Sequence, residues 1–270
     1  MFTLISENMK SFIITIVAFF SFTLIYSQEN YKVIKVNGTI VLKEKGLSLE
    51  TGTVFSEKDD LLFRTDDAVA AVINPGKGRL ILTSKNHDLS SASSNYLPSM
   101  YNISSRGGAL INILDLQNHF SGKYVVLGSQ KIEIEKKNFP MNDNNFFFLR
   151  YLYKGEEINK KLTFVDDTLI IDGKALYTVD GKPIPSPDNT TIKLFYRKGT
   201  ESLEISRFDL IFPDPQQVSK EINVILEQLK TRSSKEKIEE IGSFINEFYG
   251  KVTNDNLAWW LRKNYGLTIK

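Results

Sequence analysis

The sequence predicts a mainly β protein with a C-terminal α-helical subdomain, which is an α+β fold. Residues 30–84 and 109–212 consist of short apolar runs separated by Gly, Asn and Asp, the pattern of antiparallel strands and turns. After residue 212 the apolar residues change to a spacing of three and four, which is typical of helices. Hydrophobic residues make up 41% of the 270 residues and charged residues 24%, as in a globular protein.

The N-terminus has the pattern of a secretory signal peptide. Lys10 precedes an uncharged, largely apolar run over residues 11–27, and the polar sequence QENYK follows it. This run is shorter than the ~20 residues of a membrane-spanning helix, so we favour cleavage near Ser27 over an uncleaved anchor. Met9 is an alternative start to Met1. We expect a periplasmic or secreted protein that meets the membrane only through its signal segment, residues 1–27.

The absence of cysteine and the small net charge exclude several function classes. Without cysteine there are no disulfides, thiol nucleophiles or cysteine-containing metal sites. The net charge is +2, and Lys and Glu are intermixed along the chain, so we expect no nucleic-acid partner.

Residues 30–84 predict a small SH3-like β module with tight turns. One turn lies in VINPGKGRLIL, residues 72–82. A phosphate-binding loop would need a hydroxyl residue after the lysine and a helix behind it, whereas a strand pattern follows here. Pro75, with Gly76 or Gly78, instead predicts a β-hairpin. Lys77 and Arg79 are expected to be solvated charges. The Ser- and Asn-rich residues 85–108 predict a connection.

The order of motifs in residues 33–83 resembles the exported β-rich domain of FecR-type proteins. The matching positions are Gly38, Leu49, Gly52, Val54, Asp60, Leu62, Thr65, the alanine-rich residues 68–71 and Gly76 or Gly78. The resemblance implies an envelope interaction or sensing module. FecR-type regulators usually also carry a transmembrane helix that joins this domain to a cytoplasmic anti-sigma segment. Almost nothing precedes the signal-like run here, so transmembrane signalling is not implied.

Residues 109–212 predict a second, larger β domain that opens with a short helix. Ala109, Ile113, Leu116 and Phe120 have helical spacing. Strand patterns follow, and the Asp-Gly pairs at 172–173 and 180–181 predict two hairpins.

Residues 213–270 predict a helical subdomain. Two apolar stripes precede a third, shorter helix, and Ser233 and Glu236 have the spacing of a capping box. The third helix is expected to begin after residues 253–255 (TND) and to end at Gly266.

Catalytic, cofactor and metal signatures are not found in the sequence. The two histidines, His87 and His119, lack zinc-site spacing, and no Gly-x-Ser-x-Gly nucleophile motif or calcium-loop pattern occurs. Adjacent aspartates at 59–60, 66–67 and 166–167 fall in expected turns. We therefore assign no catalytic residue, cofactor or metal ligand.

Aromatic residues give the candidate binding site. In FFFLRYLY, residues 146–153, alternation places Tyr151 and Tyr153 on one strand face and Arg150 on the other. The run is interpreted as a central strand buried on both faces, or as an aromatic platform with Arg150 as its polar anchor. In the third helix, Trp259 points about 100° away from Trp260. It is either a contact residue or a second layer of packing.

These patterns favour an exported, non-enzymatic envelope interaction or scaffolding protein that binds a protein partner. The candidate contact residues are Arg150, Tyr151, Tyr153 and Trp259. One alternative is an envelope hydrolase whose carboxylates meet only in the folded chain. The other is a small-ligand or glycan binder that uses the aromatic second β domain. The sequence predicts no oligomeric state.

Overall fold

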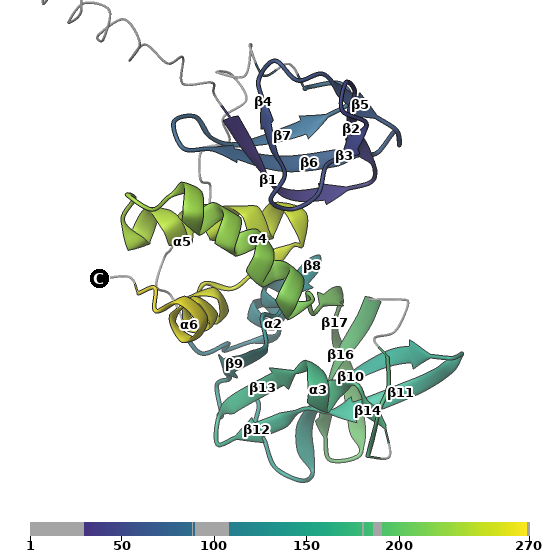
Figure 1. Ribbon diagram of the computed structural model, residues 1–270. Helices are drawn as coiled ribbons and strands as arrows, with labels where there is room; N and C mark the ends of the chain where they lie inside the picture. Colours follow the sequence, from purple (N-terminus) through teal and green to yellow (C-terminus); the bar gives the residue numbers. More distant parts are fainter. Residues whose placement is uncertain (1–29, 88, 90–107, 180, 186–190, 269–270) are drawn as a thin grey trace, which may run out of the picture.

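The computed structural model describes residues 30–87, 89, 108–179, 181–185 and 191–268 of the chain. The signal-like run and most of the 85–108 connection therefore lie outside the described residues. The protein is mainly β with helices at the C-terminus, as predicted. Helices α4 (Pro215–Gln228), α5 (Ser234–Phe248) and α6 (Asn254–Tyr265) lie between an N-terminal β module and a second, larger β module (Figure 1). No helix in the described ranges is long and apolar enough to cross a lipid bilayer.

Seven strands form the first module. One sheet has the order β4-β1-β6-β7 and the other the order β3-β2-β5, and all pairings are antiparallel. Buried side chains such as Val33, Ile40 and Leu80 fill the space inside the module. The strands are β1 (Asn30–Asn37), β2 (Ile40–Leu42), β3 (Leu47–Ser48), β4 (Val54–Ser56), β5 (Leu61–Phe63), β6 (Val69–Asn74) and β7 (Gly78–Thr83).

The hairpin predicted in residues 72–82 is confirmed. Strands β6 and β7 pair in antiparallel register up to Asn74 and Gly78. Asn74 Oδ1 accepts hydrogen bonds from the backbone N–H groups of Gly76 (2.8 Å) and Lys77 (2.9 Å), and Gly78 has the positive φ of 80° that closes the turn. The prediction that Arg79 is a solvated charge is wrong, because its side chain is fully buried against helix α5.

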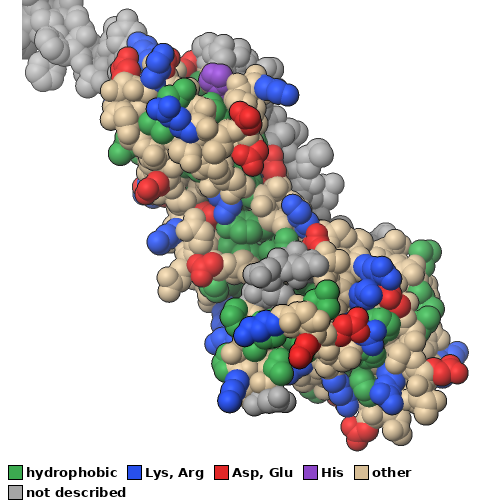
Figure 2. All heavy atoms as spheres, turned by 90° about the vertical axis from the view of Figure 1, so that its right-hand side faces the viewer, with side chains coloured by type: hydrophobic (Ala, Val, Ile, Leu, Met, Phe, Trp, Pro, Cys, Tyr) green, Lys and Arg blue, Asp and Glu red, His purple; other side chains and the backbone are tan. Residues whose placement is uncertain are grey.

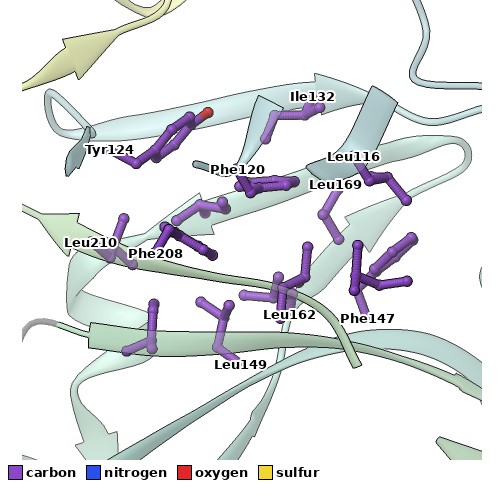
Figure 3. Close-up of a cluster of buried hydrophobic side chains, with 14 of the residues drawn as sticks. Leu116, Phe120, Tyr124, Ile132, Phe147, Leu149, Leu162, Leu169, Phe208 and Leu210 are labelled. Atoms are coloured by element: carbon purple, nitrogen blue, oxygen red, sulfur yellow. The ribbon is translucent and has the colours of Figure 1, made fainter. Parts of the chain in front are cut away.

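The second module combines a six-stranded sheet, β11-β10-β16-β17-β8-β18, with a three-stranded sheet, β12-β13-β9. Leu149, Leu162, Leu169 and Phe208 converge between them in the main core of the module (Figure 3). The elements up to β17 are α2 (Ile113–His119), β8 (Lys123–Val125), β9 (Ser129–Glu133), β10 (Asn145–Tyr153), β11 (Glu156–Lys161), β12 (Thr163–Val165), β13 (Thr168–Asp172), α3 (Gly173–Leu176), β14 (Thr178–Val179), β15 (Lys182–Pro183), β16 (Thr191–Lys198) and β17 (Glu201–Ile211).

Two local predictions for this module are wrong because Asn and Asp cap helices. Helix α2 begins at Ile113 rather than at residue 109, since Asn112 and Asp115 form a capping box that fixes its start. The expected hairpin at residues 172–173 is the start of α3, where Asp172 accepts a hydrogen bond from the Ala175 N–H at 3.0 Å. Asp180, in the second expected hairpin, lies outside the described residues, while β14 and β15 pair on either side of it.

The C-terminal helices are α4 (Pro215–Gln228), α5 (Ser234–Phe248) and α6 (Asn254–Tyr265). The predicted capping box of Ser233 and Glu236, the Thr253 cap and the end at Gly266 are confirmed. Their apolar sides share one core with Ile34 and Ile73 of the first module. The tail also contributes a strand that the sequence did not predict, β18 (Lys251–Val252), which pairs in parallel with β8.

Polar contacts also join α4 and α5 to the first module. The fully buried Glu221 carboxylate of α4 receives Lys35 Nζ of β1 at 2.9 Å and the Tyr249 hydroxyl at 2.6 Å. Burial raises the pKa of Tyr249, and the hydrogen bond to Glu221 raises it further. Arg79 of β7 forms a second set of contacts with α5. The first module is therefore fixed to the tail by both charge pairs and apolar packing.

Candidate functional site

A cleft of about 490 Å³ lies where the end of α2, strand β9 and the start of α6 meet. We call it the α6 cleft. Most of its lining side chains are polar or charged, which distinguishes it from the apolar pockets that hold most small ligands. The lining residues are Gly108, Leu110, His119, Gln130, Lys131, Ile132, Glu133, Thr168, Thr253, Asn254 and Asp255.

Asn256 fixes α6 against the segment between β8 and β9. Its side chain is buried, its Oδ1 accepts a hydrogen bond from Leu127 N–H at 2.7 Å, and its Nδ2 donates to the carbonyls of Leu127 (3.2 Å) and Ser129 (3.0 Å). A single side chain thus forms hydrogen bonds with three backbone groups beside the cleft. This anchoring sets the distance between β9 and α6.

Gln130 and Thr253 form a second link across the same boundary. Gln130 lies on β9 with 3% of its surface exposed, and its Nε2 donates to Thr253 Oγ1 at 2.8 Å. The same hydroxyl accepts from Asn256 N–H at 3.3 Å and so caps α6. The Gln130 Oε1 atom is buried without a hydrogen-bond partner among the described residues.

His119 contributes an uncharged imidazole to the cleft. Burial lowers the pKa of His119 to about 4, and the charge of Lys251 adds to this effect. The His119 Nε2 atom lies 2.7 Å from the Tyr124 hydroxyl, and burial raises the pKa of Tyr124. Both groups are therefore neutral at pH 7, and they present hydrogen-bonding atoms rather than charge.

Two smaller hollows adjoin the cleft on the side of Trp259. One, of about 200 Å³, shares Gln130, Lys131 and Asp255 with it. The other, of about 390 Å³, reaches Arg262 and the end of α6. Asp255 lines all three hollows, and Trp259 lines both smaller ones. Because the three hollows share Asp255, we treat them together with Trp259 as one surface, which we call the α6 surface.

Trp259 is partly buried and packs against the helical core that contains Trp260, as the second-layer interpretation expects, while its ring also lines the two smaller hollows. A Cβ atom at Gly128 would lie 3.6 Å from its ring, so the indole packs closely on the chain between β8 and β9. Lys263 Nζ lies 5.0 Å from the ring centroid on α6. The neighbouring Trp260, in contrast, is a core residue with 7% exposure. Trp259 is therefore a partly exposed aromatic ring with little freedom to move.

The arrangement is suited to binding through hydrogen bonds and charge pairs. Lys131 supplies a cation, Glu133 and Asp255 supply carboxylates, and the buried amide and hydroxyl groups supply fixed dipoles. Within the described ranges, no three His, Asp or Glu side chains come close enough together to hold a metal ion.

The residues predicted from the β10 run lie elsewhere in the molecule. Tyr151 is 2% exposed in the core of the second module, where its hydroxyl donates to the Leu176 carbonyl at 3.0 Å, so it is not available to a partner. Tyr153 packs on the edge of the same core. Arg150 lies on the opposite sheet face, over the ring of Phe195. Of the four predicted contact residues, only Trp259 lines the α6 surface.

Sequence reasoning missed most of the α6 surface. For His119 the sequence shows only that zinc-site spacing is lacking, and no motif marks Gln130 or Asn256. The TND sequence did predict the start of α6, which is the one local signal that points to this place. Comparisons with protein-family models, curated proteins and solved structures found no match for this chain.

Proposed function

We propose that this chain is an exported, non-enzymatic protein of the cell envelope that binds a protein partner through the α6 surface. The signal-like residues 1–27 support export, and the FecR-like order of motifs in residues 33–83 supports a role in the envelope. Both remain predictions from the sequence. The α6 surface gives the proposal a specific place in the fold.

The observation that carries the proposal is the position of Trp259. Tryptophan is the residue type most enriched among those that dominate protein–protein binding energy. Here a partly exposed indole lies between two hollows, with Asp255 and Arg262 as charged neighbours. An apolar centre with a charged rim is the usual anatomy of such an interface.

Rigidity of the surrounding backbone supports the same function. Asn256 and the Gln130–Thr253 pair tie α6 to β9 through side-chain hydrogen bonds. A preformed surface loses little conformational entropy when a partner binds, so more of the contact energy is available as affinity.

The test is capture from an envelope extract with the mature chain and two variants of the α6 surface, W259A and K131E. We expect the wild-type chain to retain a stoichiometric partner, and W259A to weaken its binding at least ~30-fold. K131E, at an exposed position on β9, should also weaken it. V54A is the matched control, because Val54 is 53% exposed on the first module, away from the α6 surface.

Two results would contradict the proposal. The first is that no stoichiometric partner is captured. The second is that W259A and K131E capture the partner as strongly as the control V54A does. Melting temperatures of all variants should be measured alongside, so that loss of binding is separated from loss of folding.

A small polar ligand is the second candidate, because the α6 cleft at about 490 Å³ has the volume of a ligand site. Such a ligand would raise the melting temperature of the isolated mature chain when a library of polar metabolites is screened. K131E should abolish that shift, whereas V54A should keep it. A screen in which no compound shifts the melting temperature would contradict this second candidate.

A further inference from the structure

The outer face of the six-stranded sheet carries a cluster of cations. Register pairs Arg150 of β10 with Lys193 of β16, and Lys193 with Arg207 of β17, so the three side chains lie in one row on one face. Lys161 lies opposite Phe148, and Arg197 lies opposite Phe146, on the same face. We call this the basic sheet face, defined by Arg150, Lys161, Lys193, Arg197 and Arg207.

A layer of phenylalanine rings lies beneath these cations. Phe148 and Phe195 stack at 5.0 Å between centroids with an interplanar angle of 7°, and each is 7% exposed. The Arg150 guanidinium lies 4.6 Å above the Phe195 ring, and Lys161 Nζ lies 4.6 Å from the Phe146 ring. The rings therefore hold the cations in place through cation–π contact.

The cations outnumber the carboxylates on this face. Glu204 of β17 lies opposite Phe195 and bonds to Arg207 at 2.5 Å. The hydrogen bond from Arg207 is the main cause that lowers the pKa of Glu204, and the charges of Arg207, Lys193 and Arg150 lower it further. Glu157 lies 3.7 Å from Arg150. Asp143 lies 3.5 Å from Lys161, and Asp209 is on the same face two residues after Arg207. The five cations therefore exceed the four carboxylates by one, and Lys123 of β8, opposite Asp209, adds a sixth cation.

We propose that the basic sheet face is a second binding surface, and that it takes an extended acidic segment of a protein. Glu204 already shows how a carboxylate is received there, among the Arg150, Lys193 and Arg207 side chains. Arginine forks bind carboxylates in a fixed geometry, so preordered guanidinium groups select for them.

The spacing of the cations fits an extended chain. Lys193 and Arg197 are four residues apart on β16, which separates them by about 13 Å along the strand. An acidic peptide in extended conformation repeats its side chains at the same intervals, with every second one on the same side. Carboxylates at positions i and i+4 of such a peptide can therefore meet both cations at once.

The covered rings argue against other polyanions. Single-stranded nucleic acid binds by stacking bases on exposed aromatic rings, but the rings of Phe148 and Phe195 are almost fully covered. A membrane surface would need several protruding apolar side chains beside the cations. On β10 this face offers one, Leu152, which is 50% exposed. In the side view of Figure 2, charged and hydrophobic side chains are mixed over the second module, without a large apolar patch.

The probe is a fluorescein-labelled peptide of about ten glutamates, titrated with the mature chain at ~50 mM salt and followed by anisotropy. Wild-type protein should bind it, and binding should weaken as salt rises. The double variant K193E/R197E should weaken binding at least ~10-fold, and K161E on the edge strand should weaken it less. W259A should bind as wild type, because the basic sheet face does not include α6.

The matched control is K136E/K137E, which makes the same change in net charge at two exposed positions of the same module. It should change binding less than ~2-fold. Equal losses in the two double variants would overturn the proposal, since attraction would then depend on net charge alone. No binding of the peptide by wild-type protein would overturn it too. A third result would also overturn the proposal: the protein binds an acidic oligosaccharide or phosphatidylserine vesicles through Lys193 and Arg197, but does not bind the peptide.

Discussion

The guanidinium of Arg79 lies 2.5 Å from the carboxylate of Glu240, measured from Nε to Oε1, and this ion pair joins the first β module to the C-terminal helices. Glu247 accepts a second hydrogen bond from the same group, and Ser243 Oγ accepts a third at 2.9 Å. The arginine side chain is fully buried, whereas the Glu240 side chain is 14% exposed. The buried Arg79 charge therefore links the first β module to helix α5. Its burial is compensated by hydrogen bonds to Glu240, Glu247 and Ser243.

Replacing Arg79 with alanine should destabilise the protein by about 3 kcal/mol, because two carboxylates lose their partner and a cavity is left. Urea unfolding of the mature chain measures the change. K77A, in the same hairpin, is the control. Its ion pair with Glu57 is partly exposed, so the expected loss is below ~1 kcal/mol. Equal losses for R79A and K77A would contradict the structural role of Arg79.

Asn256 gives a second prediction. Changing Asn256 to alanine leaves the N–H and carbonyl of Leu127 and the Ser129 carbonyl without their partner, which should cost at least about 2 kcal/mol. N264A removes one hydrogen bond, to the Trp260 carbonyl on the same helix, and should cost ~1 kcal/mol or less. Urea unfolding compares the two variants. A loss in N256A no larger than in N264A would show that Asn256 does not hold α6.

Stability should fall in acid because of His119. The pKa of this imidazole is about 4 in the folded chain and near its ordinary value of 6.5 in the unfolded chain. Below pH 6.5 the unfolded state binds a proton that the folded state does not, so stability is full above pH 6.5 and is lost as pH falls toward 4. The loss should be about 3 kcal/mol over this window.

Urea unfolding at pH 7, 5.5 and 4.5 tests this, with H119Q as the comparison. The variant lacks the titrating group, so its stability should depend less on pH over the same window. Parallel pH profiles for wild type and H119Q would contradict a buried, neutral His119.

Gly250 is a backbone position where a side chain does not fit. Its φ is 127°, and an added Cβ would lie 2.5 Å from the Lys123 carbonyl oxygen and Cβ. G250A should therefore separate β18 from β8 and lower stability by at least ~2 kcal/mol. At Gly199, φ is 61° and nothing lies within 4 Å of the added atom, so G199A should cost only ~1 kcal/mol. Similar melting temperatures for the two variants would contradict the close approach at Gly250.

The sequence correctly predicted those helix ends that are fixed by hydrogen bonds between neighbouring residues. The caps at Ser233 and Thr253 and the end at Gly266 are set by neighbouring residues, and the structure confirms them. The burial of Arg79 could not be read in the same way, because its partners Glu240 and Glu247 lie 161 and 168 residues further along the chain. Nothing near Arg79 distinguishes it from Lys77, two positions before it, which is only partly buried and pairs with Glu57.

The same reason limited prediction of the α6 surface. Its polar groups come from the end of α2, from β9 and from the start of α6, and these segments lie far apart in the chain. Tyr151 illustrates a different limit. Strand alternation correctly separates Tyr151 from Arg150, but the sequence does not show which strand face is covered. The structure places Tyr151 in the core, as the buried-strand interpretation expects, and Arg150 on the outer face.

The central claim is that a protein partner binds at the α6 surface. Hydrogen–deuterium exchange of the mature chain, with and without its captured partner, tests it most directly. We predict that the partner slows exchange in β9 and in α6, and leaves the first module unchanged. Protection confined to the first module, or equal exchange with and without the partner in β9 and α6, would contradict the claim.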